Sequence, residues 1–267
     1  MTPAPGSHLE ATFFLDHDHA SVRDFTQHVI AGASSPRERA SLLFAAVRDQ
    51  IWYDPYSVSE DPEHYRASHV LQAGRAYCVP KAVLLAAVLR AAGIPTRLGF
   101  ADVRNHLQTD TLRAVMGGTD LFVYHGYCSV YIDGRWLKAT PAFNVELCER
   151  FGVPPVEFEG QSDALMHAFT SDGTRHMEYV RDHGNFDDLP LGRILSALHQ
   201  AYGPMVTAAA GPDHAFTPPA TTGKTTPEGS VDSSGSTGLA TPTGRGPSKE
   251  LRKWYSRVLV GTSEVAR

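Results

Sequence analysis

The chain has 267 residues, of which 42% are hydrophobic, so it is long enough for one large domain with a substantial core. Its formal net charge of −5 excludes a generally basic surface of the kind that binds nucleic acid. Three cysteines are too few for a disulfide framework, and no apolar stretch approaches the roughly 20 residues of a membrane span. The N-terminus has no basic region followed by an apolar one, so no secretory signal is predicted and the expected location is the cytoplasm.

Helical and strand patterns follow one another along the first part of the chain. Apolar side chains recur at helical spacing in residues 20–30, in a segment that begins at Ser35-Pro36, and in residues 78–92 and 191–202. β-Rich runs cover residues 96–103, 121–132 and 135–140. Asp133-Gly134 joins the last two runs and is a strong hairpin signal. Helices followed by a β-meander indicate an α+β fold in which helices pack on an antiparallel sheet.

The composition changes near residue 205. Residues 217–247 contain eight threonines, six glycines and five prolines but no aromatic residue, which is too little apolar surface to offset the entropy of ordering. We therefore predict a folded domain over 8–204 and a flexible, disordered linker over 205–247. Residues 248–267 have an amphipathic pattern and are predicted to form a short helix that docks on a partner protein or packs weakly on the domain.

Cys78 lies where a loop meets the first turn of the predicted helix 78–92. The unpaired N–H groups and the positive end of the helix dipole favour the thiolate there, so we expect a lowered thiol pKa and a nucleophilic sulfur. Gly74, four residues earlier, allows the chain to approach closely. The alternative is a structural cysteine, a common role for a small buried thiol.

His125 lies in the first strand of the predicted hairpin. If Ile132 pairs with Arg135, the register places Thr140 and Asn144 diagonally beside His125 on one face. Either could hold one imidazole nitrogen while the other nitrogen addresses a thiol, which is the arrangement of nucleophile, base and orienting group in cysteine acyl-transfer enzymes. The alternative for a lone histidine in a strand is a structural role.

Two stretches, RASHVLQAGRAYCVPKAVLLAAVLRAAGIPTRLGF and HGYCSVYIDGRWLKATPAFN, resemble the transglutaminase-like superfamily, whose core is a papain-like thiol protease fold. The resemblance runs from about residue 9 to residue 202 and implies that Cys78 is the nucleophile and His125 the general base. Where that family has an aspartate after the tryptophan strand, this chain reads WLKAT and ends at Thr140. A neutral asparagine can also orient the histidine of papain-like enzymes, so Asn144 is the preferred orienting residue and Thr140 the second candidate.

The leading functional hypothesis is cysteine-dependent acyl transfer on a carboxamide or thioester. Water as acceptor would make the protein an amidase or protease, and an amine would make it an amide-forming transferase. The expected substrate is a peptide, a protein or an acyl carrier, and the backbone N–H of Cys78 is the expected oxyanion donor. The alternative is a catalytically inactive fold that acts as a protein-binding scaffold, which the missing aspartate favours.

No cofactor, metal, nucleic acid or membrane partner is predicted. The run from Asp16 to His19 resembles a ligand cluster, but it lies just before the predicted helix 20–30, where Asp18 or Ser21 would serve as the cap. Cys128 and Cys148 are interpreted as packing residues. The polar stretch 175–190 is compatible with a substrate channel or with a solvated loop.

Overall fold

Helix α4 (Cys78–Ala91) is the central element of the fold. All but one of its 14 residues are buried, as expected for a helix that is apolar on every side. It packs against strand β4 on one side and against helices α1, α2 and α3 elsewhere. The computed structural model describes residues 8–203 and 213–218, and the fold is set out here for the unit that ends at Phe216.

The main sheet has four antiparallel strands in the order β5-β4-β3-β6. Strand β4 pairs with β5 through Ile132 opposite Arg135, and Asp133 and Gly134 form the turn with positive φ angles of 49° and 81°. Two positive φ angles are the geometry of the tightest hairpin turn, so the predicted hairpin and its register are confirmed. The strands are β3 (Thr96–Asn105), β4 (Leu121–Ile132), β5 (Arg135–Ala139) and β6 (Met177–Phe186).

The remaining elements surround this helix and sheet. The helices are α1 (Ala20–Val29), α2 (Pro36–Gln50), α3 (Ala67–Ala73), α5 (Asp110–Val115), α6 (Val145–Phe151) and α7 (Leu191–Tyr202), with short 3-10 helices η2 (Pro62–Tyr65) and η4 (His214–Phe216). A separate parallel pair is formed by β1 (Trp52–Tyr53) and β2 (Arg75–Ala76). This pair matters for function because β2 leads directly into α4.

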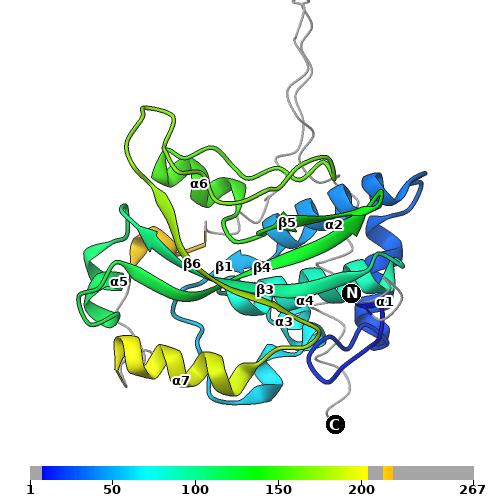
Figure 1. Ribbon diagram of the computed structural model, residues 1–267, viewed down its shortest axis with the longest axis horizontal. Coiled ribbons are helices and arrows are strands. Elements are labelled where there is room, and N and C mark those ends of the chain that lie inside the picture. Colours follow the sequence, from blue (N-terminus) through cyan, green and yellow to red (C-terminus); the bar gives the residue numbers. More distant parts are fainter. Residues whose placement is uncertain (1–7, 204–212, 219–267) are drawn as a thin grey trace, which may run out of the picture. The chain divides into compact units, whose positions relative to one another are not determined.

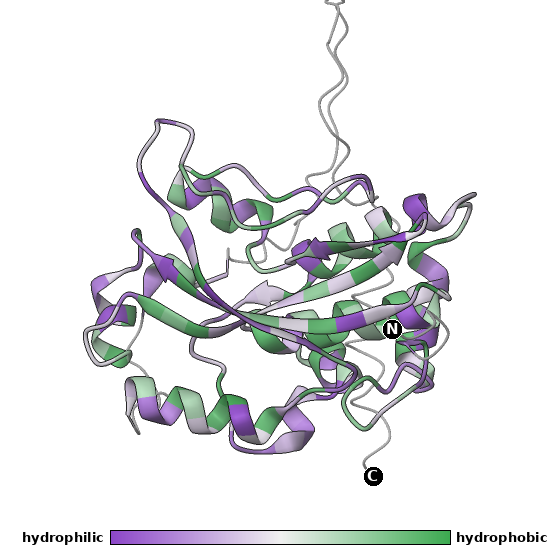
Figure 2. Ribbon diagram, viewed as in Figure 1, coloured by the Kyte–Doolittle hydropathy of each residue, from purple (hydrophilic) through white to green (hydrophobic). Residues whose placement is uncertain are grey.

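The helices of the N-terminal half cover one face of the sheet, with α4 directly behind β3 and β4 (Figure 1). Helix α7 is amphipathic and alternates apolar and polar segments along its length (Figure 2). Its buried side is made by Leu191, Ile194, Leu198 and Tyr202. The α+β fold with helices packed on an antiparallel sheet, predicted from the order of the patterns, is therefore confirmed.

Two segments differ from or extend the sequence-based expectations. Residues 177–186, left open as channel or loop, form the edge strand β6 and pair with β3 along its whole length. Residues 213–218 of the predicted flexible linker are described; His214–Phe216 form η4, and Phe216 is buried against the domain. Residues 205–212 and 219–247 of that linker and the predicted helix 248–267 lie outside the described residues.

Within residues 8–203 and 213–218, no helix has the length and apolar character needed to cross a membrane.

Candidate active site

Cys78 is the first residue of α4 and is reached through a sharp turn. Gly74 ends α3 in the left-handed conformation, with φ 64°, and turns the chain into β2. Strand β2 pairs with β1, which places Tyr53 beside Ala76 and fixes the approach to α4. The Cys78 side chain is buried, and backbone N–H groups of Gly126, Val79 and Cys78 itself are directed at its sulfur.

The thiol of Cys78 is neutral in this structure. Burial raises the pKa of the Cys78 thiol to about 11, and the three backbone N–H groups only partly oppose this effect. The expectation of a lowered pKa from the helix position alone is therefore wrong for this conformation. The cause is desolvation, which disfavours a charged sulfur more than the donors at the helix start favour it.

Gly126 lets strand β4 approach the start of α4 closely. A Cβ atom at this position would lie 3.0 Å from the Cα of Val79 and 3.1 Å from the carbonyl oxygen of Cys78. Both of these neighbours are backbone atoms and cannot rotate away. The absence of a side chain at Gly126 therefore lets the strand that carries His125 lie against the first turn of α4.

Replacing Gly126 with alanine should force β4 away from α4. We expect a loss of about 1–3 kcal/mol in the free energy of unfolding, the usual range for overpacking, together with a change in Cys78 reactivity. Gly192→Ala is the matched control, because a Cβ there meets nothing within 4 Å. Chemical denaturation of both variants measures the effect, and equal stability of the two would contradict the close approach.

His125 follows a bulge in strand β4. The pairing between β3 and β4 shifts register between Ala101 and Val103, and Tyr124 has a positive φ of 55°. A non-glycine residue in this region is strained, and bulges re-aim the side chains beside them. Asp102 stabilises the bulge, since its carboxylate accepts the Tyr124 N–H at 3.1 Å and lies 2.6 Å from Nε2 of His183, whose ring stacks on Tyr124.

Thr140 holds one nitrogen of His125. The Nε2 atom of His125 lies 3.0 Å from Oγ1 of Thr140, and the same hydroxyl donates to the carbonyl oxygen of Gly126 at 3.3 Å. Because the hydroxyl proton is used in the second bond, the threonine oxygen accepts from Nε2–H. This assigns the tautomer in which Nδ1 carries the lone pair, the form needed by a general base.

The imidazole of His125 is also neutral. Burial lowers the pKa of His125 to about 4, and no carboxylate opposes this. Thr140 can orient the ring but cannot stabilise a positive charge on it, since a hydroxyl carries no charge. Cys78 and His125 are therefore a neutral thiol and a neutral imidazole rather than a preformed ion pair.

Asn144 does not contact His125, which corrects the preference drawn from the sequence. Its Nδ2 donates to the carbonyl oxygens of Arg48 at 2.6 Å and Ile51 at 2.9 Å, and its Oδ1 accepts the N–H of Tyr53 at 2.7 Å. The distortion at Pro141 ends β5 before the predicted register could bring Asn144 beside the imidazole. Asn144 instead fixes the segment between α2 and β1.

Lys81 acts on the same two carbonyl groups. It is fully buried one turn after Cys78, and its Nζ donates to the carbonyl oxygens of Arg48 at 2.8 Å and Ile51 at 2.5 Å. Burial lowers the pKa of Lys81 to about 7. Lys81 therefore ties the first turn of α4 to the end of α2, and Asn144 ties the start of α6 to the same carbonyl groups.

Asn144→Ala should be a stability variant rather than a catalytic one. Loss of the amide leaves the buried N–H of Tyr53 without its acceptor, so we expect the unfolding free energy to fall by about 1–3 kcal/mol. The ring pKa of His125 should stay the same, as measured by NMR. The outcome that contradicts this assignment is an unchanged stability with a shifted imidazole titration.

Residues 23–141 match the family model of the transglutaminase-like superfamily. This match covers a little under half of the chain. The resemblance drawn from the two sequence motifs is thereby confirmed, and the matched range contains Cys78, His125 and Thr140 but ends before Asn144.

Two solved structures are similar to this chain. One is a "Putative Cysteine Protease from Cytophaga hutchinsonii", with 12% identity and a TM-score of 0.39, covering 68% of this chain and 56% of that one. The other is a "putative protease from Parabacteroides distasonis", with 18% identity and a TM-score of 0.33, covering 50% of this chain and 24% of that one. The chain thus spans about half of the first structure and a quarter of the second. No curated protein matches the sequence.

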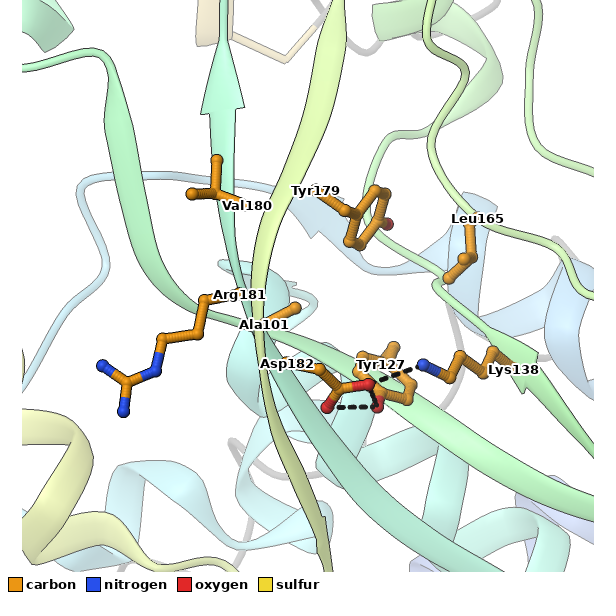
Figure 3. Close-up of a pocket in the computed structure, with 8 residues that line it drawn as sticks. All are labelled: Ala101, Tyr127, Lys138, Leu165, Tyr179, Val180, Arg181 and Asp182. Atoms are coloured by element: carbon orange, nitrogen blue, oxygen red, sulfur yellow. Dashed lines mark hydrogen bonds and ion pairs between the residues drawn. The ribbon is translucent and has the colours of Figure 1, made fainter.

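A cavity of about 220 Å³ lies beside the strands that carry His125 and its partner Ala101. Its wall includes Ala101, the strand partner of His125, and Tyr179, whose ring lies edge-on to the imidazole at 6.4 Å. Figure 3 shows Tyr179 on one side of the cavity and Tyr127, Lys138 and Asp182 together on another, where Lys138 and Asp182 form an ion pair at 2.7 Å. Tyr179 belongs to the stretch 175–190, and the pairing of the distant strand β6 with β3 brings it to the site.

The other candidates of the sequence analysis have structural contacts. Asp16 accepts hydrogen bonds from Ser68 and pairs with Arg66, and His19 caps α1 in place of the expected Asp18 or Ser21. Within the described ranges no group of three or more His, Cys, Asp or Glu side chains could hold a metal ion. Cys128 and Cys148 are buried, and Cys128 donates to the carbonyl oxygen of Ala82.

Proposed function

We propose that this protein is a cysteine-dependent acyl-transfer enzyme that acts on a carboxamide or thioester. Cys78 is the nucleophile, His125 the general base and Thr140 the residue that orients the imidazole. The observation that carries the proposal is the contact of His125 with Thr140, in which Nε2 lies 3.0 Å from Oγ1. This contact occupies Nε2, so Nδ1 is left as the basic nitrogen. The next residue in the strand, Gly126, directs its N–H at the sulfur of Cys78.

The reaction begins from a neutral pair. As the sulfur attacks the substrate carbonyl, its proton passes to Nδ1 of His125, which gives an imidazolium and a tetrahedral oxyanion. The imidazolium then protonates the leaving amine or thiol, and an acyl thioester remains on Cys78. Water or an amine, deprotonated by the same imidazole, releases the acyl group and restores the thiol.

Backbone N–H groups supply the electrostatic stabilisation. The N–H of Cys78 lies at the start of a 14-residue helix, and the N–H of Gly126 reaches the same point from strand β4. Donors fixed in the backbone need no reorganisation when the oxyanion forms, and one such donor contributes about 2.7–4 kcal/mol to transition-state stabilisation. Both donors are therefore assigned to the oxyanion.

A small activated thioester tests the proposal. After incubation of the full chain with phenyl thioacetate and an acid quench, peptide mass spectrometry should find acetyl on Cys78 and much less on Cys128 or Cys148, which serve as internal controls. His125→Ala should lower the acetylation rate at pH 7 by about 10²-fold or more. Equal acetylation of all three cysteines, or no effect of His125→Ala, would overturn the proposal.

The second candidate is an inactive fold that binds a protein partner. The observation in its favour is electrostatic: burial holds the pKa of Cys78 near 11 and that of His125 near 4, and the third residue is an uncharged threonine. A site of this kind has no preformed nucleophile. This candidate predicts no acyl enzyme under any condition, so the same mass-spectrometric measurement separates it from the first.

A further inference from the structure

Residues 213–216 occupy a groove lined by aromatic side chains from two parts of the domain, residues 53–56 and residues 143–151. The ring of Phe216 lies 5.6 Å from that of Phe151, 6.0 Å from that of Tyr56 and 6.1 Å from that of Tyr53. Only 6% of Phe216 is exposed. Phe143 completes the aromatic lining, because its ring stacks on Phe151 and meets Tyr53 edge-on at 4.8 Å.

The groove also binds the backbone of this segment. Trp52 donates its indole N–H to the carbonyl oxygen of Phe216 at 2.7 Å, and Arg150 donates to the carbonyl oxygen of Ala215 at 3.1 Å. The guanidinium of Arg150 lies 5.4 Å from the centre of the Trp52 ring, so the two donors form one unit. Backbone carbonyl groups are present in every peptide, and donors aimed at them suit a peptide ligand.

An acidic side chain is recognised at the other end of the segment. The carboxylate of Asp213 accepts from the hydroxyl groups of Tyr56 and Thr109, both at 2.6 Å. Thr109 is the N-cap of α5, so this contact joins a third region of the fold to the groove. The contacts therefore favour a peptide that has an acidic residue and, three positions later, an aromatic residue.

The groove lies next to the thiol. Tyr53, which contacts Phe216, is in β1 and pairs with Ala76, two residues before Cys78. Tyr53 therefore lies between a ligand in the groove and the strand that leads into Cys78.

We infer that this groove is a peptide-binding subsite for an acidic residue followed three positions later by an aromatic residue, and that residues 213–216 fill it in cis. The inference rests on the proposed function only where it assigns the groove to a substrate. A peptide or protein substrate must displace the segment Asp213–Phe216 to bind. Because the segment is attached to the domain, it competes at a high effective concentration.

Peptide binding to full-length variants tests this inference. The probe is a fluorescein-labelled peptide of residues 211–219, Gly-Pro-Asp-His-Ala-Phe-Thr-Pro-Pro, and its control carries alanine in place of phenylalanine. By fluorescence anisotropy, the Phe216→Ala chain should bind the probe at least about tenfold more tightly than the wild-type chain, since the cis competitor is weakened. The control peptide should bind neither chain.

A second variant keeps the test decisive if Phe216→Ala unfolds. Asp213→Asn preserves the side-chain volume but removes the charge that the two hydroxyl groups recognise, and it should also strengthen binding of the probe. The inference is overturned if folded variants fail to bind the probe, or if probe and control bind equally. Binding is read without catalysis, so a failed acyl-enzyme test with specific peptide binding would remove the proposed function and leave the groove.

Discussion

Replacing Thr140 with aspartate should raise the pKa of His125 by about two units. A carboxylate 3–4 Å from the imidazolium gains about 4 kcal/mol at an effective dielectric constant near 20, and part of this gain is offset by the cost of burying the new charge at a site with no exposure. The site would move from a neutral pair towards a thiolate and an imidazolium. We expect the labelling of Cys78 by iodoacetamide at pH 7 to become about tenfold faster or more.

Thr140→Asn is the matched control for this change. Asparagine has nearly the same shape as aspartate and can accept the Nε2–H bond, but it brings no charge. NMR titration of the imidazole and the labelling rate of Cys78 should therefore distinguish the two variants. If they titrate and label alike, the absence of charge at Thr140 is not what holds the pair neutral.

Acidification should destabilise the protein through His125. The pKa of this residue falls from about 6.5 to about 4 on folding. Below pH 6.5 the unfolded chain therefore binds a proton that the folded chain does not, and the unfolding free energy decreases as the pH falls from 6.5 to 4. At pH 4.5 the loss from this residue is about 2–3 kcal/mol.

Urea denaturation at pH 7.0, 5.5 and 4.5 measures this loss, with His125→Gln as the variant that cannot titrate. The difference in stability between pH 7.0 and 4.5 should be smaller in the variant. His176, whose pKa burial also lowers to about 4, remains in both proteins and accounts for acid sensitivity that the variant keeps. A variant with the full pH dependence of the wild-type chain would contradict the burial of a neutral His125.

Local sequence patterns predicted the secondary-structure elements that carry the site residues. The cysteine at the start of α4 and the hairpin that carries His125 both follow from short sequence signals, the helical spacing of apolar residues in 78–92 and an Asp-Gly turn. These elements were predictable because each is stabilised by residues close together in the chain. The resemblance to the transglutaminase-like superfamily then indicated that Cys78 and His125 belong to one site.

The remaining features of the site depend on packing between residues that are far apart in the sequence. The thiol pKa has the opposite sign to the prediction because Cys78 is buried by packing between elements distant in sequence, among them strand β4 at Gly126. The choice between Thr140 and Asn144 depended on where β5 ends, which a register argument could not fix beside Pro141. The packing of Phe216 depends on aromatic partners about 65 to 165 positions away, which no local pattern reveals.

The buried amine of Lys81 serves two carbonyl groups, those of Arg48 and Ile51. An ammonium has three N–H donors, and a neutral amine still has two. The number of donors that remain after the proton is lost therefore equals the number of acceptors to be satisfied. Since burial brings the pKa of Lys81 to about 7, its charge can change near neutral pH while the tether between α2 and the nucleophile's helix stays intact. Lys81 can therefore gain or lose its proton without moving the helix that carries Cys78.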